Sequence, residues 1–135
     1  MELKQVLGKI EESREDMVRI MSEMIRIPAI APVNGGTGEG KRADMLAGYL
    51  EGYDSIIRDD VRDDLDPSVI RPNILAKKNG KGKGTVWIVA HTDTVPVGDL
   101  KDWETDPFEP VVKDGRIYGR GTEDNGQAVL SAMFA

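Results

Sequence analysis

The stretch "TVWIVAHTDTVP", residues 85–96, decides the fold. Its first half, "TVWIVA", is an unbroken run of apolar and β-branched residues, which is typical of a strand buried on both faces. The segments before it have the patterns of helices and then strands, and a helix pattern closes the sequence. This order predicts an α/β domain built on a mixed sheet.

The flanking segments supply the other expected elements. Apolar residues recur every three or four positions from residue 3 to residue 25, which predicts one helix that Pro28 ends. A second helix is expected at 43–50, and Asp114-Gly115 predicts the tight turn of a hairpin. The remaining expected elements are strands at 55–61 ("SIIRDDV") and 73–78 ("NILAKK") and a helix from Gly126.

Composition narrows the class of protein. The 135 residues are enough for one domain, 1–135, and 39% apolar with 31% charged residues is a globular balance. The apolar runs are too short to span a membrane, and the amino terminus lacks a secretory signal, so the cytoplasm is expected. A net charge of −6 argues against a nucleic-acid partner. The absence of cysteine leaves imidazole and carboxylate as metal ligands, a set that suits zinc, manganese or cobalt.

A glycine-rich stretch, "NGGTGEGKRA" (34–43), is similar to a phosphate-binding loop. It matches that pattern from Gly35 to Lys41, but Arg42 stands where a hydroxyl side chain should hold magnesium. A helix broken by prolines precedes it, whereas a phosphate-binding loop follows a buried strand. The stretch therefore predicts a mobile connection beside a site, and nucleotide binding is the weaker alternative.

The single histidine, His91, comes directly after the predicted central strand. Ligand sites in open α/β sheets gather beyond the carboxyl ends of strands. Asp93 lies two residues on, so in extended backbone both side chains point the same way. The carboxylate can then hold one ring nitrogen while the other faces a metal. The alternative is a solvated or capping histidine beside an ordinary turn aspartate.

A second cluster, "GRGTEDNGQ" (119–127), lies between a strand and the last helix. Its glycines permit a tight turn that presents Asp124 near the start of that helix. A carboxylate there can bridge two cations, as in two-metal hydrolases. The alternative is that Asp124 only caps the helix.

Taken in order, "HTDTVP", "DWETDPFEP", the Asp-Gly hairpin and "GRGTEDNGQ" resemble a known family. It is the family of zinc aminoacylases and peptidases that includes succinyl-diaminopimelate desuccinylase, acetylornithine deacetylase, aminoacylase and carboxypeptidase G. The resemblance covers the amino-terminal part of these enzymes and continues through "IPAIAP" and "GEGKRADMLAGYLEG". It implies a three-layer α/β/α fold.

The resemblance also implies roles for matching residues. His91 would bind one zinc, and Asp124 would bridge two zinc ions. Asp93 would be a catalytic-site residue whose carboxylate contacts the His91 ring. A cis peptide would follow Asp124. Many relatives read D-x-K-G where this chain reads D-N-G-Q, so a role for that lysine is not carried over.

The implied function is hydrolysis of amide bonds in N-acyl amino acids or small peptides, in a homodimeric parent protein. The sequence stops inside a helix pattern at Ala135, which predicts a fragment without the lid domain and the rest of the catalytic domain. Such a fragment is expected to be inactive and to self-associate through apolar surface at Val129, Leu130 and Phe134. The alternative is a catalytically silent relative that serves in binding or assembly.

Overall fold

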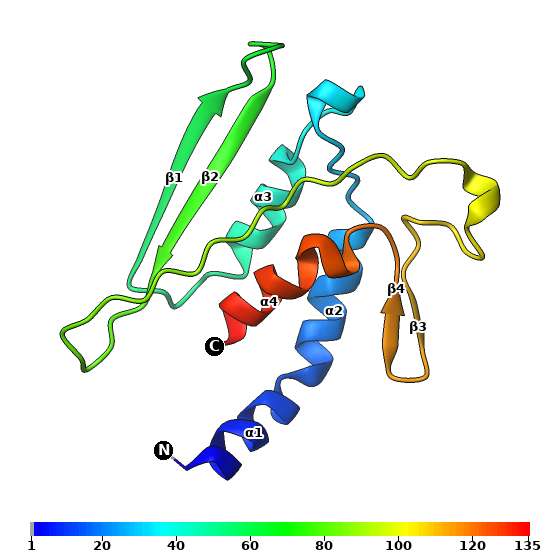
Figure 1. Cartoon of the computed structure of the whole chain (residues 1–135). Helices are drawn as coiled ribbons and strands as arrows, with labels where there is room; N and C mark the ends of the chain where they lie inside the picture. Colours follow the sequence, from blue (N-terminus) through cyan, green and yellow to red (C-terminus); the bar gives the residue numbers. More distant parts are fainter. Residues whose placement is uncertain (1) are drawn as a thin grey trace.

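The computed structural model describes residues 2–135, which form an α/β chain as predicted (Figure 1). Across these residues every helix falls short of the length and apolar character that crossing a membrane requires. The elements, in order, are α1 (Leu3–Glu12), α2 (Arg14–Ile25), α3 (Gly40–Gly48), β1 (Ser55–Arg62), β2 (Ile70–Lys77), β3 (Val111–Lys113), β4 (Arg116–Tyr118) and α4 (Gln127–Phe134).

The amino-terminal helix is interrupted, where the sequence pattern predicted one continuous helix. The break falls at Ser13, whose hydroxyl donates a hydrogen bond to the carbonyl of Lys9 at 3.0 Å. A serine hydroxyl that bonds to the carbonyl four residues earlier competes with the hydrogen bonds of the helix backbone and favours a bend. The two halves also differ in burial, because Leu3 and Leu7 of α1 are exposed whereas α2 carries the core.

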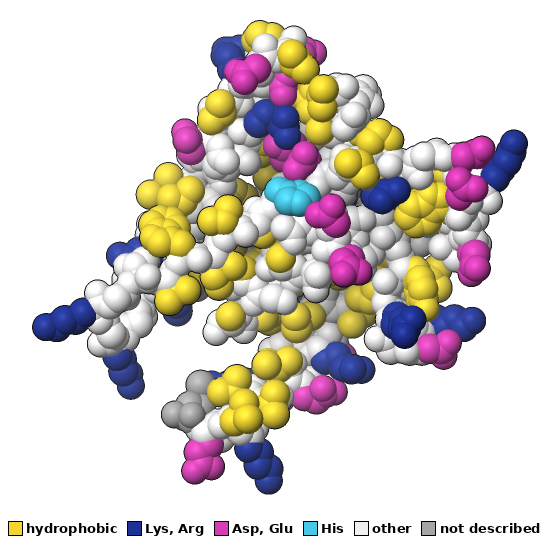
Figure 2. Space-filling view, viewed as in Figure 1, with side chains coloured by type: hydrophobic (Ala, Val, Ile, Leu, Met, Phe, Trp, Pro, Cys, Tyr) yellow, Lys and Arg dark blue, Asp and Glu magenta, His cyan; other side chains and the backbone are white. Residues whose placement is uncertain are grey.

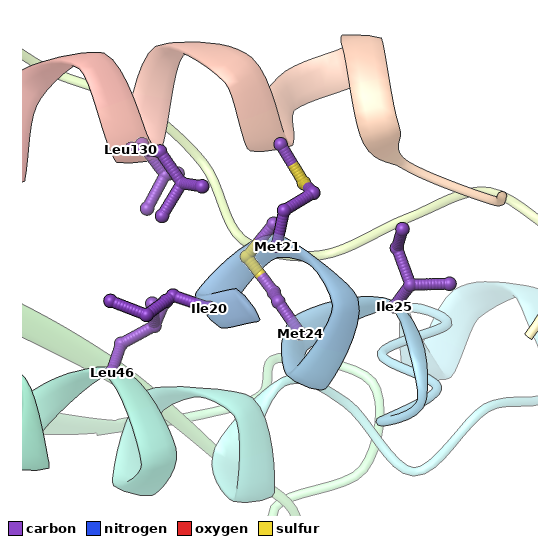
Figure 3. Close-up of a cluster of buried hydrophobic side chains, with 7 residues drawn as sticks. Ile20, Met21, Met24, Ile25, Leu46 and Leu130 are labelled. Carbon is purple, nitrogen blue, oxygen red and sulfur yellow. The ribbon is translucent and has the colours of Figure 1, made fainter. Parts of the chain in front are cut away.

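The hydrophobic core lies where α2 packs between α3 and α4 (Figure 3). Helical spacing puts the apolar residues of α2 on one face. That face packs against both α3 and α4. The predicted apolar patterns of α2, α3 and α4 are thus confirmed as one core. Its buried members are Ile20, Met21, Met24, Ile25, Leu46, Val129 and Leu130.

The described strands form two separate antiparallel pairs. Strand β1 pairs with β2 from Ser55 opposite Lys77 to Arg62 opposite Ile70, and β3 pairs with β4. The β3–β4 turn confirms the prediction made for Asp114-Gly115, since both residues have positive φ, 52° and 73°. Two-residue hairpin turns require this left-handed backbone, which glycine and aspartate tolerate.

The prediction of a buried strand at 85–90 is wrong for this structure. The segment is extended but unpaired, and Val86 and Val89 are 87% and 88% exposed. A strand is buried on both faces only when other strands and two helical layers surround it. Residues 86–90 and part of β2 instead line an open hollow of about 830 Å³, whose wall includes residues of α4.

The chain after this segment is anchored to the connection between α2 and α3. Thr94 donates its backbone N–H to the carbonyl of Ala29 at 2.8 Å, and Ile30 and Thr94 form a parallel bridge. Ala31 in turn donates to the Thr94 carbonyl at 3.3 Å. This short bridge fixes the "HTDT" motif against the connection between α2 and α3.

Candidate metal centre

His91 and Asp124 meet although 33 positions separate them in the sequence. The Nε2 atom of His91 lies 2.9 Å from Oδ1 of Asp124, and both side chains are accessible to solvent. His91 follows the extended segment 85–90, and Asp124 lies in the turn Thr122–Gly126 between β4 and α4. In Figure 2 the histidine lies at the surface with acidic side chains beside it.

Asp93 occupies the other side of the His91 ring. Its Oδ1 lies 3.3 Å from Nδ1 of His91, and its backbone carbonyl lies 3.2 Å from the same nitrogen. The two carboxylates, of Asp93 and Asp124, therefore face opposite ring nitrogens. This is the arrangement in which a carboxylate on Nδ1 fixes the ring while Nε2 remains available as a ligand.

Close packing of glycines gives the Asp124 turn its shape. Gly121 has a φ of 81°, and a Cβ at this position would lie 2.7 Å from Cγ2 of Thr94. A Cβ at Gly126 would lie 2.6 Å from the carbonyl oxygen of Gly121. The turn is therefore pressed against the "HTDT" segment, which brings Asp124 to His91. The peptide between Asp124 and Asn125 is cis, as the family resemblance implied.

The donor chemistry of this pair fits a zinc-type cation. Imidazole nitrogen and carboxylate oxygen suit zinc, cobalt or manganese. The set of ligands is incomplete. Residues 2–135 contain no group of three or more His, Cys, Asp or Glu side chains placed to hold one ion. Asp93 does not complete the set, since it faces the ring nitrogen opposite the one that Asp124 contacts.

Arg42 lies beneath the motif and is the largest fully buried side chain, 2% exposed. Its guanidinium donates to the Ile27 carbonyl, at 2.7 Å from Nη2, and to the Thr92 carbonyl, at 2.8 Å from Nη1. Burial lowers the pKa of Arg42 to about 10, and the nearby Asp93 opposes that shift. The residue that departs from the phosphate-loop pattern thus points into the protein and donates to the backbone of the "HTDT" segment.

A second arginine reaches Asp93 directly. Arg71 lies with its Nη2 3.6 Å from Oδ2 of Asp93, and its Nε donates to Oε1 of Glu39 at 2.7 Å. The sequence patterns missed Arg42, Arg71 and Glu39 as members of the site. Arg42 binds carbonyls 15 and 50 positions away, and Arg71 binds Glu39 from 32 positions away, separations at which local spacing carries no signal.

A hollow of about 560 Å³ adjoins Asp124. Trp103, from the loop between the two motifs, lines it and donates its indole N–H to the carbonyl of Val97 at 2.8 Å. The Arg120 guanidinium stacks over the indole, 5.0 Å from the ring centre. The hollow therefore leaves open space next to Asp124.

Comparisons with known proteins return the family that the motifs resemble. Residues 87–135 match the model of peptidase family M20/M25/M40. An uncharacterized metallohydrolase of Methanocaldococcus jannaschii is 38% identical over 128 residues, 89% of this chain and 31% of its own length. A succinyl-diaminopimelate desuccinylase of Buchnera aphidicola is 46% identical over 69 residues, 47% of this chain and 18% of its own length.

A solved structure supports the same fold. The di-peptidase Dug1p of Saccharomyces cerevisiae superposes with a TM-score of 0.82 at 25% identity, over 98% of this chain and 30% of its own chain. The chain spans about a third of the length of the curated metallohydrolases it matches. The predicted resemblance is thereby confirmed: residues 87–135 match the M20/M25/M40 peptidase family, and the chain has an α/β fold like that of the di-peptidase.

Proposed function

We propose that this sequence belongs to a metal-dependent hydrolase that cleaves amide bonds in N-acyl amino acids or small peptides, with a pair of zinc ions. The contact between Nε2 of His91 and Oδ1 of Asp124, at 2.9 Å, carries the proposal. It brings the two motifs together with a donor set that zinc accepts. The names of two relatives, a desuccinylase and a di-peptidase, fit this class of reaction.

Each residue of the centre would have its own task. His91 would bind one cation through Nε2, and Asp124 would bridge two cations through its carboxylate. When bound, the zinc pair supplies Lewis-acid polarisation of the amide carbonyl. Asp93 would keep the ring proton on Nδ1 of His91, so that the lone pair of Nε2 faces the cation.

We further propose that the 135-residue chain alone binds zinc weakly and does not hydrolyse amides. A dinuclear centre needs about four to six ligand groups, and two converge here. Each missing ligand lowers affinity, because the remaining groups must still be desolvated and ordered. Calorimetric titration of zinc into the chain should show no tight, stoichiometric binding, whereas such binding would show that the chain holds a complete site.

A chimera tests the roles of the residues in the presence of a full ligand set. Residues 87–135 would replace the corresponding segment of the Buchnera desuccinylase, and desuccinylation would be measured. We expect the chimera to be active and His91→Ala or Asp124→Ala to abolish activity. Asp93→Asn should lower activity by about 10–100-fold, the usual effect of losing the partner of a metal-binding histidine.

The chimera also separates the enzyme from a catalytically silent relative. A folded chimera that is inactive with its native His91 and Asp124 would favour a binding or assembly role. Activity that survives His91→Ala would contradict the proposed centre outright. The cytoplasmic location and the pairing of two subunits stay predictions from the sequence.

A further inference from the structure

Four charged side chains form a series that ends on the His91 ring. Glu39 is 6% exposed and accepts a hydrogen bond from Nε of Arg71 at 2.7 Å. The Nη1 of Arg71 donates to Oδ2 of Asp63 at 3.0 Å, and its Nη2 lies 3.6 Å from Oδ2 of Asp93. The other oxygen of Asp93 faces Nδ1 of His91 at 3.3 Å.

The geometry gives Arg71 a specific effect on Asp93. A guanidinium is a planar fork, so two fixed arms determine where the third arm points. Glu39 and Asp63 hold the first two arms of Arg71, and the third lies beside one oxygen of Asp93. A carboxylate attracted at one oxygen has less freedom to rotate, which keeps its second oxygen toward the imidazole.

The glycine-rich connection explains how Glu39 reaches this place. A Cβ on Gly36 would lie 1.9 Å from the carbonyl oxygen of Ile30, so only glycine fits against that strand-like segment. Gly38 has a φ of 78° and packs against Val69, where a Cβ would lie 3.3 Å from Cγ1. The chain thus folds tightly beneath the metal motif and delivers a buried carboxylate to Arg71.

We propose that Arg71 is a positioning residue of the metal centre, which orients Asp93 and through it the His91 ring. Glu39, presented by the glycine-rich connection, holds Arg71 in place. This role gives the stretch that resembles a phosphate loop a function in building the centre. The inference rests on the proposed function, since it assigns Arg71 a part in preparing His91 to bind a cation.

The test uses the single histidine as its own probe. The full chain would be prepared with ¹⁵N-labelled histidine, so that every ring nitrogen signal comes from His91. In the native chain Nδ1 should report the contact with Asp93, and Nε2 should report the contact with Asp124. Arg71→Gln and Glu39→Gln should each shift the Nδ1 signal more than the Nε2 signal at constant pH, because freer rotation of Asp93 weakens its contact with Nδ1.

A double substitution shows whether Arg71 acts through Asp93. Asp93→Asn should alter the His91 signals, and adding Arg71→Gln to it should cause no further change, because the two residues share one pathway. Arg58→Gln is the matched control: Arg58 also pairs with two carboxylates, Asp44 and Asp60, but it lies on β1. The control should leave the His91 signals unchanged.

Unchanged His91 signals in both Arg71→Gln and Glu39→Gln, with the amide spectrum of the folded chain preserved, would overturn the inference. If Arg71→Gln fails to fold, Glu39→Gln decides, since it keeps the shape of the buried side chain. An equal effect of Arg58→Gln would also overturn it. The spectra need neither metal nor substrate, so unchanged His91 signals would overturn the role of Arg71 but not the proposed function. Conversely, an inactive chimera would count against the proposed function but not against the effect of Arg71 on the His91 ring.

Discussion

The two sides of the molecule are held together by different forces. On the helical side, α2 buries its apolar face against α3 and α4, and Ile25 is fully buried. On the sheet side, every residue of β1 is exposed, and ion pairs of Arg58 with Asp44 and of Arg71 with Glu39 link the hairpin to α3 and its preceding loop. The exposed residues 86–89 line one hollow together with β2 of this side.

This difference shows that residue type alone does not determine burial. Ile25 and Ile88 have the same side chain, yet Ile88 is 58% exposed. An amphipathic helix carries its buried face in local spacing and needs only one partner, whereas a central strand needs neighbours on two edges and two faces. The helical side obtains its partners within residues 2–135, and the segment 85–90 does not.

The largest expected effect is a direct test of this comparison. Ile25→Ala should lower the free energy of unfolding by about 2–5 kcal/mol, because it removes buried methyl groups and leaves a cavity. Ile88→Ala should change it by less than about 0.5 kcal/mol, as at other exposed positions. Urea denaturation of both variants provides the measurement. A loss for Ile88→Ala as large as that for Ile25→Ala would mean that the segment is buried in solution.

A smaller effect concerns self-association. The sequence placed the apolar contact surface at Val129, Leu130 and Phe134, but Val129 and Leu130 are buried in the core. A contiguous run of exposed apolar residues lies instead at 86–89. Contiguous exposed apolar surface drives association, so replacing Trp87 and Val89 together by lysine should weaken self-association by roughly tenfold.

Sedimentation velocity over a range of concentrations measures this association. The control replaces Leu3 and Leu7 by lysine, since these residues are exposed on α1, away from the segment. We expect the control to retain most of the association. If the two lysine variants associate equally, the segment 85–90 has no special part in contacts between copies.

The smallest effect tests the ionic link of the sheet side. The backbone N–H of Asp66, and then the guanidinium of Arg71, donate hydrogen bonds that lower the pKa of Asp63 below its ordinary value of 3.8. The stabilisation is therefore fully present above pH 3.8 and is lost as the pH falls through the lower pKa of the folded state. Between about pH 6 and about pH 2.5, wild type should lose more stability than Asp63→Asn. Equal losses in urea titrations at the two pH values would remove Asp63 from this link.

The sequence predicted those features whose causes are local. The turn at Asp114-Gly115 follows from two residues that tolerate positive φ, and the helices follow from apolar spacing. The family resemblance assigned His91 and Asp124 to one pair of metal ions, and the two side chains lie within 2.9 Å of each other. Their roles as metal ligands stay predictions.

The remaining features depend on partners that no local pattern reveals. The burial of Arg42 is set by carbonyls 15 and 50 positions away. The exposure of 85–90 is set by which strands lie beside it, and a run such as "TVWIVA" carries no information about their presence. In the sequence Arg71 is an ordinary strand residue, and only the structure shows that it pairs with both Glu39 and Asp63.

The core shown in Figure 3 also has a consequence for synthesis on the ribosome. Ile20 and Ile25 emerge early, but their partner Leu130 on α4 is made roughly a hundred residues later. At about 5–20 residues per second, the apolar face of α2 waits about 5–20 seconds for its last layer. During that interval α2 exposes its apolar face to solvent. Exposed apolar surface of this kind makes a nascent chain prone to aggregation and is the reason that chaperones are needed. The order of translation thus makes the best-packed part of the finished chain its most vulnerable part while it is being made.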